Sequence, residues 1–89
     1  MTTIEVTQQD IDNANEWRKI ISPERGITYN CPVSRAFQRV TKDKHAYWGY
    51  TMGEAGDRTY EAVESTMVRG WVHNWDAKLG VKPFQFRTE

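Results

Sequence analysis

The hydrophobic patterns of this chain predict an α+β domain, with helices packed on one face of a small antiparallel sheet of about four strands, in the order β-α-α-β-β-α-β. Three observations lead to this fold class. Short alternating runs typical of strands open and close the chain, and longer segments between them carry apolar residues at helical spacing. A run rich in aromatics is followed by glycines and a second short run, as in a hairpin. The chain has 89 residues, which is the size of a single domain covering residues 1–89.

The first strand and helix are predicted close to the start of the chain. Residues 4–6 alternate as a strand does, and Thr7 is followed three positions later by Asp10, a capping box with Asp in place of Glu. With Thr7 as the N-cap, the apolar residue before it and Ile11 occupy the two positions of a hydrophobic staple. We therefore expect a helix that begins after Thr7 and ends near Ile20.

A second helix is predicted after a loop at Ser22–Asn30. Pro32 suits the first helical turn, with Cys31 or Asn30 as the cap. Apolar residues then recur at helical spacing, and we expect them to be buried: Val33, Ala36, Phe37 and Val40. The polar residues between them are expected to face water or a partner: Ser34, Arg35, Gln38 and Arg39.

The stretch AYWGYTM, residues 46–52, predicts the first strand of a hairpin. Its alternation assigns four residues to the core face: Ala46, Trp48, Tyr50 and Met52. Tyr47 then stands on the opposite, solvated face. The segment from Gly53 to Gly56 is expected to form the turn, in a loop longer than the tightest type, and the second strand begins at Arg58.

The strongest helical pattern lies in the last third of the chain. Its apolar positions are Val68, Trp71, Val72, Trp75 and Leu79. Ser65 or Thr66 is expected to cap this helix, and Gly80 is expected to be the left-handed residue after it. Phe84 and Phe86 share one face of a closing strand.

Composition narrows the classes of function. The 12 basic and 12 acidic residues cancel, which argues against an acidic mimic of nucleic acid and against a non-specific DNA coat. One cysteine and two distant histidines exclude a disulfide framework and argue against a zinc site, so we expect no metal and no cofactor. The N-terminus lacks a secretion signal and no window is long and apolar enough to span a membrane. We expect a cytoplasmic protein that does not bind membranes.

Cys31 is the candidate nucleophile of the chain. A thiol at a helix N-terminus has a lowered pKa, because the helix dipole favours the thiolate. A reactive thiol also needs a base, and neither His45 nor His73 stands in a sequence typical of a Cys and His protease. The favoured interpretation is a small, half-buried residue at a helix start. We therefore expect a protein without enzymatic activity, with a Cys31 enzyme as the less favoured alternative.

A basic segment at residues 35–45 and an acidic hairpin supply the candidate binding residues. Together with the aromatic ring between them, they are Arg35, Arg39, Lys42, Lys44, Tyr47, Glu54 and Asp57. Arginines beside an aromatic residue are typical of protein interfaces, and also of sites for nucleic acid or a small phosphorylated ligand. A solvated charged surface without a partner is the third interpretation. Opposite patches on one small domain favour a complementary protein partner or a homodimer over a nucleic-acid coat.

Three motifs together resemble short proteins encoded by bacteriophages and prophages. They are IEVTQQDID (V-T-x-x-D-I), NCPVSRAFQRV (a C-P-V helix start) and VKPFQF (P-F-x-F). The resemblance assigns no functional residues. It implies a small non-enzymatic protein that acts in the host cytoplasm by binding a host protein or protein complex. Inhibition of a host defence system, of the anti-CRISPR kind, is the task that this origin implies.

Overall fold

The computed structural model describes residues 2–20 and 30–89 and confirms the α+β fold class. The described strands are β1 (Thr2–Val6), β2 (Tyr47–Trp48), β3 (Met52–Ala55), β4 (Arg58–Glu61) and β5 (Phe84–Thr88). The described helices are α1 (Gln8–Ile20), α3 (Pro32–Thr41) and α4 (Ser65–Asp76). The predicted loop at Ser22–Asn30 lies, apart from Asn30, outside the described residues.

The strands form two antiparallel sheets that meet at one corner. β1 pairs with β5, and β2, β3 and β4 form a three-stranded sheet in that order. An isolated bridge between Ala62 and Thr88 joins the two sheets, with a hydrogen bond from Val63 N to Arg87 O of 2.8 Å beside it. The described strands thus form two small sheets in place of the single sheet expected, with five strands where the sequence predicts about four.

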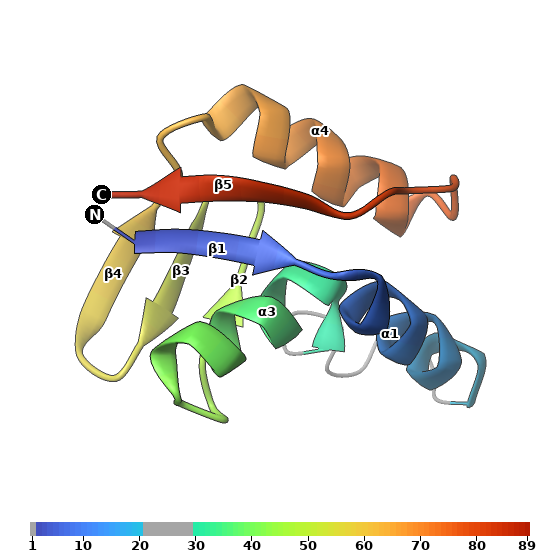
Figure 1. The fold of residues 1–89 in the computed structure, drawn as a ribbon, viewed down its shortest axis with the longest axis horizontal. Helices are drawn as coiled ribbons and strands as arrows, with labels where there is room; N and C mark the ends of the chain where they lie inside the picture. Colours follow the sequence, from blue (N-terminus) through green and yellow to red (C-terminus); the bar gives the residue numbers. More distant parts are fainter. Residues whose placement is uncertain (1, 21–29) are drawn as a thin grey trace.

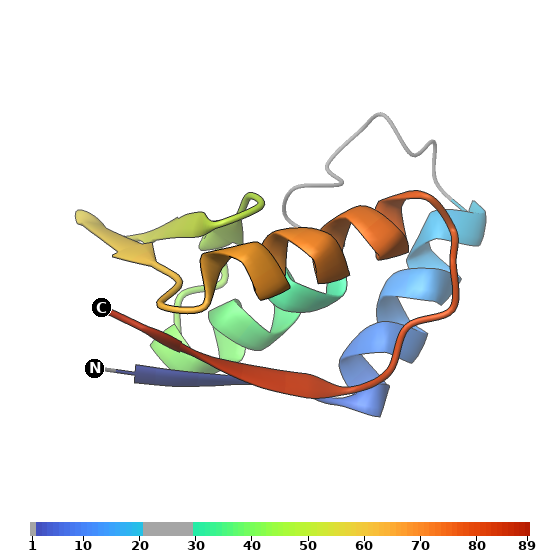
Figure 2. The same cartoon turned by 90° about the horizontal axis from the view of Figure 1, so that it is seen from above.

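Helix α3 lies at the centre of the domain. It contacts α1, β1, β2 and β3. Figure 2 shows α3 and α4 on the same side of the β1–β5 ribbon, and Figure 1 shows α4 above that ribbon and α3 below it. Both views place α1 at the far end from the three-stranded sheet. The same views place both ends of the chain together beside β4.

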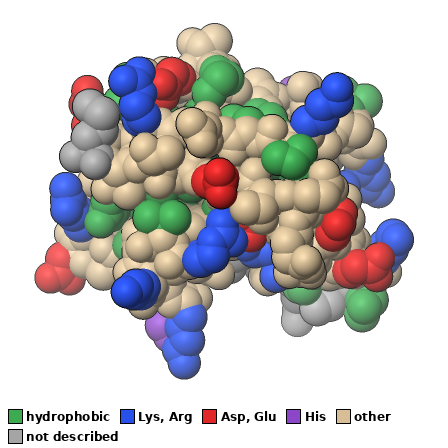
Figure 3. Space-filling model, viewed as in Figure 1, with side chains coloured by type: hydrophobic (Ala, Val, Ile, Leu, Met, Phe, Trp, Pro, Cys, Tyr) green, Lys and Arg blue, Asp and Glu red, His purple; other side chains and the backbone are tan. Residues whose placement is uncertain are grey.

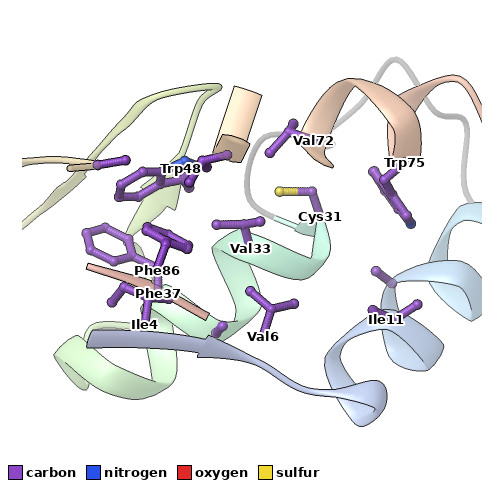
Figure 4. Packing of buried hydrophobic residues seen from close by; sticks show 14 of the residues in the cluster. Ile4, Val6, Ile11, Cys31, Val33, Phe37, Trp48, Val72, Trp75 and Phe86 are labelled. Carbon is purple, nitrogen blue, oxygen red and sulfur yellow. The ribbon is translucent and has the colours of Figure 1, made fainter. Parts of the chain in front are cut away.

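Large aromatic side chains fill the space between these elements. Trp48 lies between two phenylalanines, with ring centroids 5.2 Å from Phe37 and 5.0 Å from Phe86. Figure 4 shows this aromatic group at the sheet end of the core and the ring of Trp75 at the α1 end. Burial of such rings supplies most of the apolar area that a chain of this size can remove from water.

The start of α1 forms as the sequence predicts. The Thr7 hydroxyl accepts a hydrogen bond from Asp10 N at 3.2 Å, and the Asp10 carboxylate accepts one from Thr7 N at 2.9 Å. This is a reciprocal capping box. Val6 and Ile11, the two positions of the staple, are both buried.

The polar residues of α3 do not all face water, and here the sequence prediction is wrong. Ser34 is fully buried, and its hydroxyl accepts from Trp48 N at 2.8 Å and donates to Trp48 O at 3.3 Å. One turn later, Gln38 Nε2 donates to Ala46 O at 2.9 Å. β2 is an edge strand, and these side chains bond the backbone groups that a neighbouring strand would bond.

The hairpin also differs from the prediction, because the aromatic run contains a turn. Gly49 N donates to Met52 O at 2.8 Å, so β2 ends at Trp48. Tyr50 and Met52 therefore leave the core and are 48% and 42% exposed. The second hairpin turns tightly at residues 56–57, since Ala55 pairs with Arg58, and Gly56 supplies the required positive φ of 61°.

Helix α4 buries Val68, Val72 and Trp75 as predicted, but both of its ends differ. Its N-cap is Glu64 rather than Ser65 or Thr66, and the Glu64 carboxylate binds Arg87 at 2.8 Å instead of capping the helix. The left-handed residue after the helix is Lys78, with φ 64°, rather than Gly80. The chain therefore leaves the helical path early, and Leu79 is 57% exposed.

Replacement of Ser34 tests whether its hydroxyl holds β2. Ser34→Ala leaves the N–H and C=O of Trp48 buried without this partner, so we expect a loss of about 1–3 kcal/mol in the free energy of unfolding. The measurement is urea unfolding. The control is Ser65→Ala at an exposed position of α4, with an expected change within about 0.5 kcal/mol. Equal losses in the two variants would contradict the assignment.

Candidate functional site

Arg39, predicted to bind a partner, is bonded within the domain. Its Nη1 lies 2.7 Å from Asp10 Oδ1, and its Nη2 lies 3.1 Å from Asp10 Oδ2 and 2.8 Å from Glu5 O. Burial by itself would raise the pKa of Asp10, but the hydrogen bonds from Arg39 and Thr7 outweigh it and hold that pKa below its ordinary value. Arg39 thus joins α3 to the start of α1.

Arg35 points to the beginning of its own helix. Its Nε donates to Asn30 O at 3.0 Å, and its Nη2 donates to Asn30 Oδ1 at 3.3 Å. The two arginines of α3 therefore have different partners. Both guanidinium groups are thus bonded within the domain.

Three of the other predicted residues lie beside a junction of two turns. The Asp43 carboxylate accepts from His45 N at 2.9 Å and from Gly56 N at 2.8 Å, which joins the turn after α3 to the turn between β3 and β4. These backbone bonds lower the pKa of Asp43. The neighbours of this junction along the chain are exposed: Lys42, Lys44 and Asp57.

The three-stranded sheet has an inner and an outer face. Its register places Trp48, Gly53 and Tyr60 in one row, which faces Phe37 of α3. The neighbouring residues in each strand point the other way, because side chains alternate along a strand. We call this opposite side the outer sheet face, and it consists of Tyr47, Met52, Glu54, Thr59 and Glu61. Tyr47 lies on the opposite face from Trp48, as predicted, and it is half-buried.

The outer sheet face combines apolar area with two carboxylates. Met52 is 42% exposed. Glu54 and Glu61 are exposed, and neither takes part in the three ion pairs of the described residues. On the side of the molecule drawn in Figure 3, by comparison, acidic and basic side chains are interspersed.

Sequence reasoning identified Tyr47 and Glu54 of this face but missed Met52 and Thr59. The alternation that starts at Ala46 places Met52 on the core face only if the strand continues through Gly49. A glycine inside an alternating run is a known sign of a bend or a turn, and it was the available signal.

Cys31 lies in the core rather than in an accessible site. It is 4% exposed and is the N-cap of α3, where its sulfur accepts from Ser34 N at 3.4 Å and its thiol donates to Ser34 Oγ at 3.3 Å. Burial raises the pKa of the Cys31 thiol, and the bonds to Ser34 do not offset it. The geometry therefore disfavours the thiolate that a nucleophile requires.

Within residues 2–20 and 30–89, no group of three or more His, Cys, Asp or Glu side chains is placed to hold a metal ion. None of the described helices has the length and apolar character needed to cross a membrane. Comparisons with protein-family models, curated proteins and solved structures found no match.

The close packing behind the outer sheet face can be tested at Gly53. A Cβ there would lie 2.5 Å from Tyr47 O and 2.6 Å from Trp48 Cε3, so Gly53→Ala must shift the sheet. We expect a loss of about 1–3 kcal/mol in the free energy of unfolding. Gly49→Ala is the matched control, since its nearest neighbour is an ordinary contact at 3.5 Å. A Gly53 variant as stable as the Gly49 variant would be inconsistent with this packing.

The pair of Asp10 and Arg39 predicts a pH dependence. Because the folded pKa of Asp10 is below 3.8, its contribution to stability is complete above the unfolded pKa and is lost as pH falls through the folded pKa. Asp10→Asn should cost about 1 kcal/mol at pH 7, allowing for the half-exposed Arg39. That cost should shrink below pH 3.8. Urea unfolding of the wild-type protein and the variant, at pH 7 and at a pH below 3.8, measures this cost. A cost of Asp10→Asn that is the same at both pH values would refute the ionic role of the Asp10 carboxylate.

Proposed function

We propose that this protein is a non-enzymatic protein-binding module and that the outer sheet face is its contact surface. The observation that carries the proposal is the composition of that face. It is a pleated surface with an exposed Met52 beside Tyr47, and its two carboxylates take part in none of the described ion pairs. Methionine and tyrosine are enriched in protein interfaces relative to the rest of the surface.

The rigidity of the sheet supports the same proposal. Gly53 packs against the strand β2 and against Phe37, and Ser34 holds the edge of β2 from behind. A face supported in this way loses little conformational freedom on binding, which favours affinity. Glu54 and Glu61 would select a partner with a basic surface, since like charges across an interface are repelled.

The proposed contact surface is narrower than the set of residues taken from the sequence. It keeps Tyr47 and Glu54. It omits Arg35 and Arg39, because their guanidinium groups bond Asn30 and Asp10. The exposed Lys42, Lys44 and Asp57 lie next to the junction of the two turns, at the margin of the surface.

The resemblance to phage proteins gives the proposal its more specific form. We propose that the partner is a host protein of a defence system, bound in the host cytoplasm. Co-expression with a defence system of the CRISPR kind, challenged with a targeted plasmid, tests this form. Plasmid survival that depends on wild-type protein and is lost with an outer-face variant is the expected result. If the plasmid is lost equally with and without the protein in every defence system tested, inhibition of host defence is contradicted. That result would not contradict the outer sheet face as a protein-binding surface.

The contact surface itself is tested with paired variants in a pull-down from host lysate. One double variant, Tyr47→Ala with Met52→Ala, removes apolar contacts from the outer sheet face. The other, Glu54→Lys with Glu61→Lys, reverses the charge of that face. Asp12→Lys with Glu16→Lys is the matched control, because it makes the same charge change on the exposed side of α1. The lysate is treated with nuclease, and the captured partner is then purified to measure affinity.

We expect both outer-face variants to weaken binding to the purified partner at least about tenfold, and the control to leave it unchanged. Thermal unfolding of each variant shows whether it is folded. Binding that survives in both outer-face variants would refute the surface. Capture of nucleic acid alone, lost as salt rises, would instead support the alternative site on the basic segment 35–45.

A further inference from the structure

A hollow lies between α1 and the chain that follows α4, away from the outer sheet face. Its volume is about 520 Å³, within the range of small-molecule sites. α1 contributes Ile11, Asn15 and Arg18, and the end of α4 contributes Trp75. The remaining wall comes from residues 78–81, the segment that leaves the helical path at Lys78.

Arg18 is held in a fixed position in this hollow. Its Nη1 donates to Trp75 O at 2.6 Å, and its Nη2 donates to Asn15 Oδ1 at 3.3 Å. The guanidinium carbon lies 4.0 Å from the centre of the Trp75 ring, in a cation–π contact. Asn15 Oδ1 also accepts from Trp75 Nε1 at 2.9 Å, so all three side chains belong to one network.

The charge of Arg18 has no ionic partner among the described residues. Their three ion pairs involve other cations, and the described residues that line the hollow include no carboxylate. Burial lowers the pKa of Arg18, and the more distant Asp76 does not compensate for it. Lys19 and Lys78 line the same hollow and add positive charge. An anion placed here would therefore be stabilised more than an anion at an exposed arginine.

Part of the wall of the hollow is apolar. Ile11 and Trp75 are almost fully buried, while Leu79 is 57% exposed. Val81 is half-buried on the same side. The hollow thus offers a fixed guanidinium group beside the hydrocarbon surface of Leu79 and Val81, a pairing typical of sites for amphipathic ligands.

We propose that this hollow binds a small organic carboxylate with an apolar body. The carboxylate accepts hydrogen bonds from Arg18, and the body packs against Leu79 and Val81. A single fixed guanidinium group matches one carboxylate, because its N–H groups form a planar fork. The lysines attract the anion without fixing its geometry. This site is independent of the proposed protein-binding surface.

The test is a titration of the ¹⁵N-labelled full chain with three probes, followed by NMR. 4-Phenylbutyrate has both a carboxylate and an apolar body. 4-Phenylbutyramide has the same apolar body with a neutral amide in place of the carboxylate, and acetate has the carboxylate without the apolar body. We expect 4-phenylbutyrate to shift the indole N–H of Trp75 and the Nε–H of Arg18, with a Kd below about 1 mM. The amide should bind at least about tenfold more weakly, because it cannot form the charge-assisted bond. Acetate should produce smaller shifts at the same groups.

Variants give a second readout. Arg18→Gln should reduce the affinity for 4-phenylbutyrate at least about tenfold, while Arg69→Gln, at an exposed position of α4, should not change it. Even if Arg18→Gln unfolds the protein, the affinities of the wild-type chain for 4-phenylbutyrate and 4-phenylbutyramide show whether the hollow recognises a carboxylate. Equal affinities for the acid and the amide, shifts confined to other residues, or no shift up to about 10 mM would each overturn the proposal.

Discussion

The structure depends on the hydrogen bonds between the buried Ser34 hydroxyl and the backbone of Trp48. These bonds occupy the N–H and the C=O that the short edge strand β2 turns toward α3. Gln38 bonds Ala46 O one turn further along. Without such partners the edge would carry buried, unbonded backbone groups, and each of those costs about as much as a lost hydrogen bond. α3 can therefore pack against the sheet and bring Phe37 into contact with Trp48.

This arrangement is the reason that the proposed contact surface omits the polar residues of α3. Ser34 and Gln38 bond β2, Arg39 bonds the start of α1, and Arg35 bonds Asn30. The helix is central, so its polar side chains meet other elements in several directions. The proposed contact surface is the side of the three-stranded sheet that faces away from α3. Its carboxylates and exposed methionine belong to strands whose inner residues are held by the helix.

The net charge of zero conceals a separation of charge within the domain. Glu54 and Glu61 lie on the outer sheet face, while Arg18 and Lys78 line the hollow beside α1. A net charge of zero argues against a strongly charged partner that contacts the whole molecule. It does not describe the electrostatic potential at one place on the surface. The two proposed sites attract ligands of opposite charge for this reason.

Local patterns in the sequence determined the fold class, the capping box at Thr7 and Asp10, and the helix start at Pro32, because each depends on residues a few positions apart. They also determined that Tyr47 and Trp48 face opposite sides. Tertiary structure decided the burial of Ser34, the internal bond of Arg39 and the hollow around Arg18. Each of these depends on a partner from another part of the chain: Arg18 and Trp75, for example, are 57 positions apart. Spacing along one element shows which residues share a face, but only packing shows what that face meets.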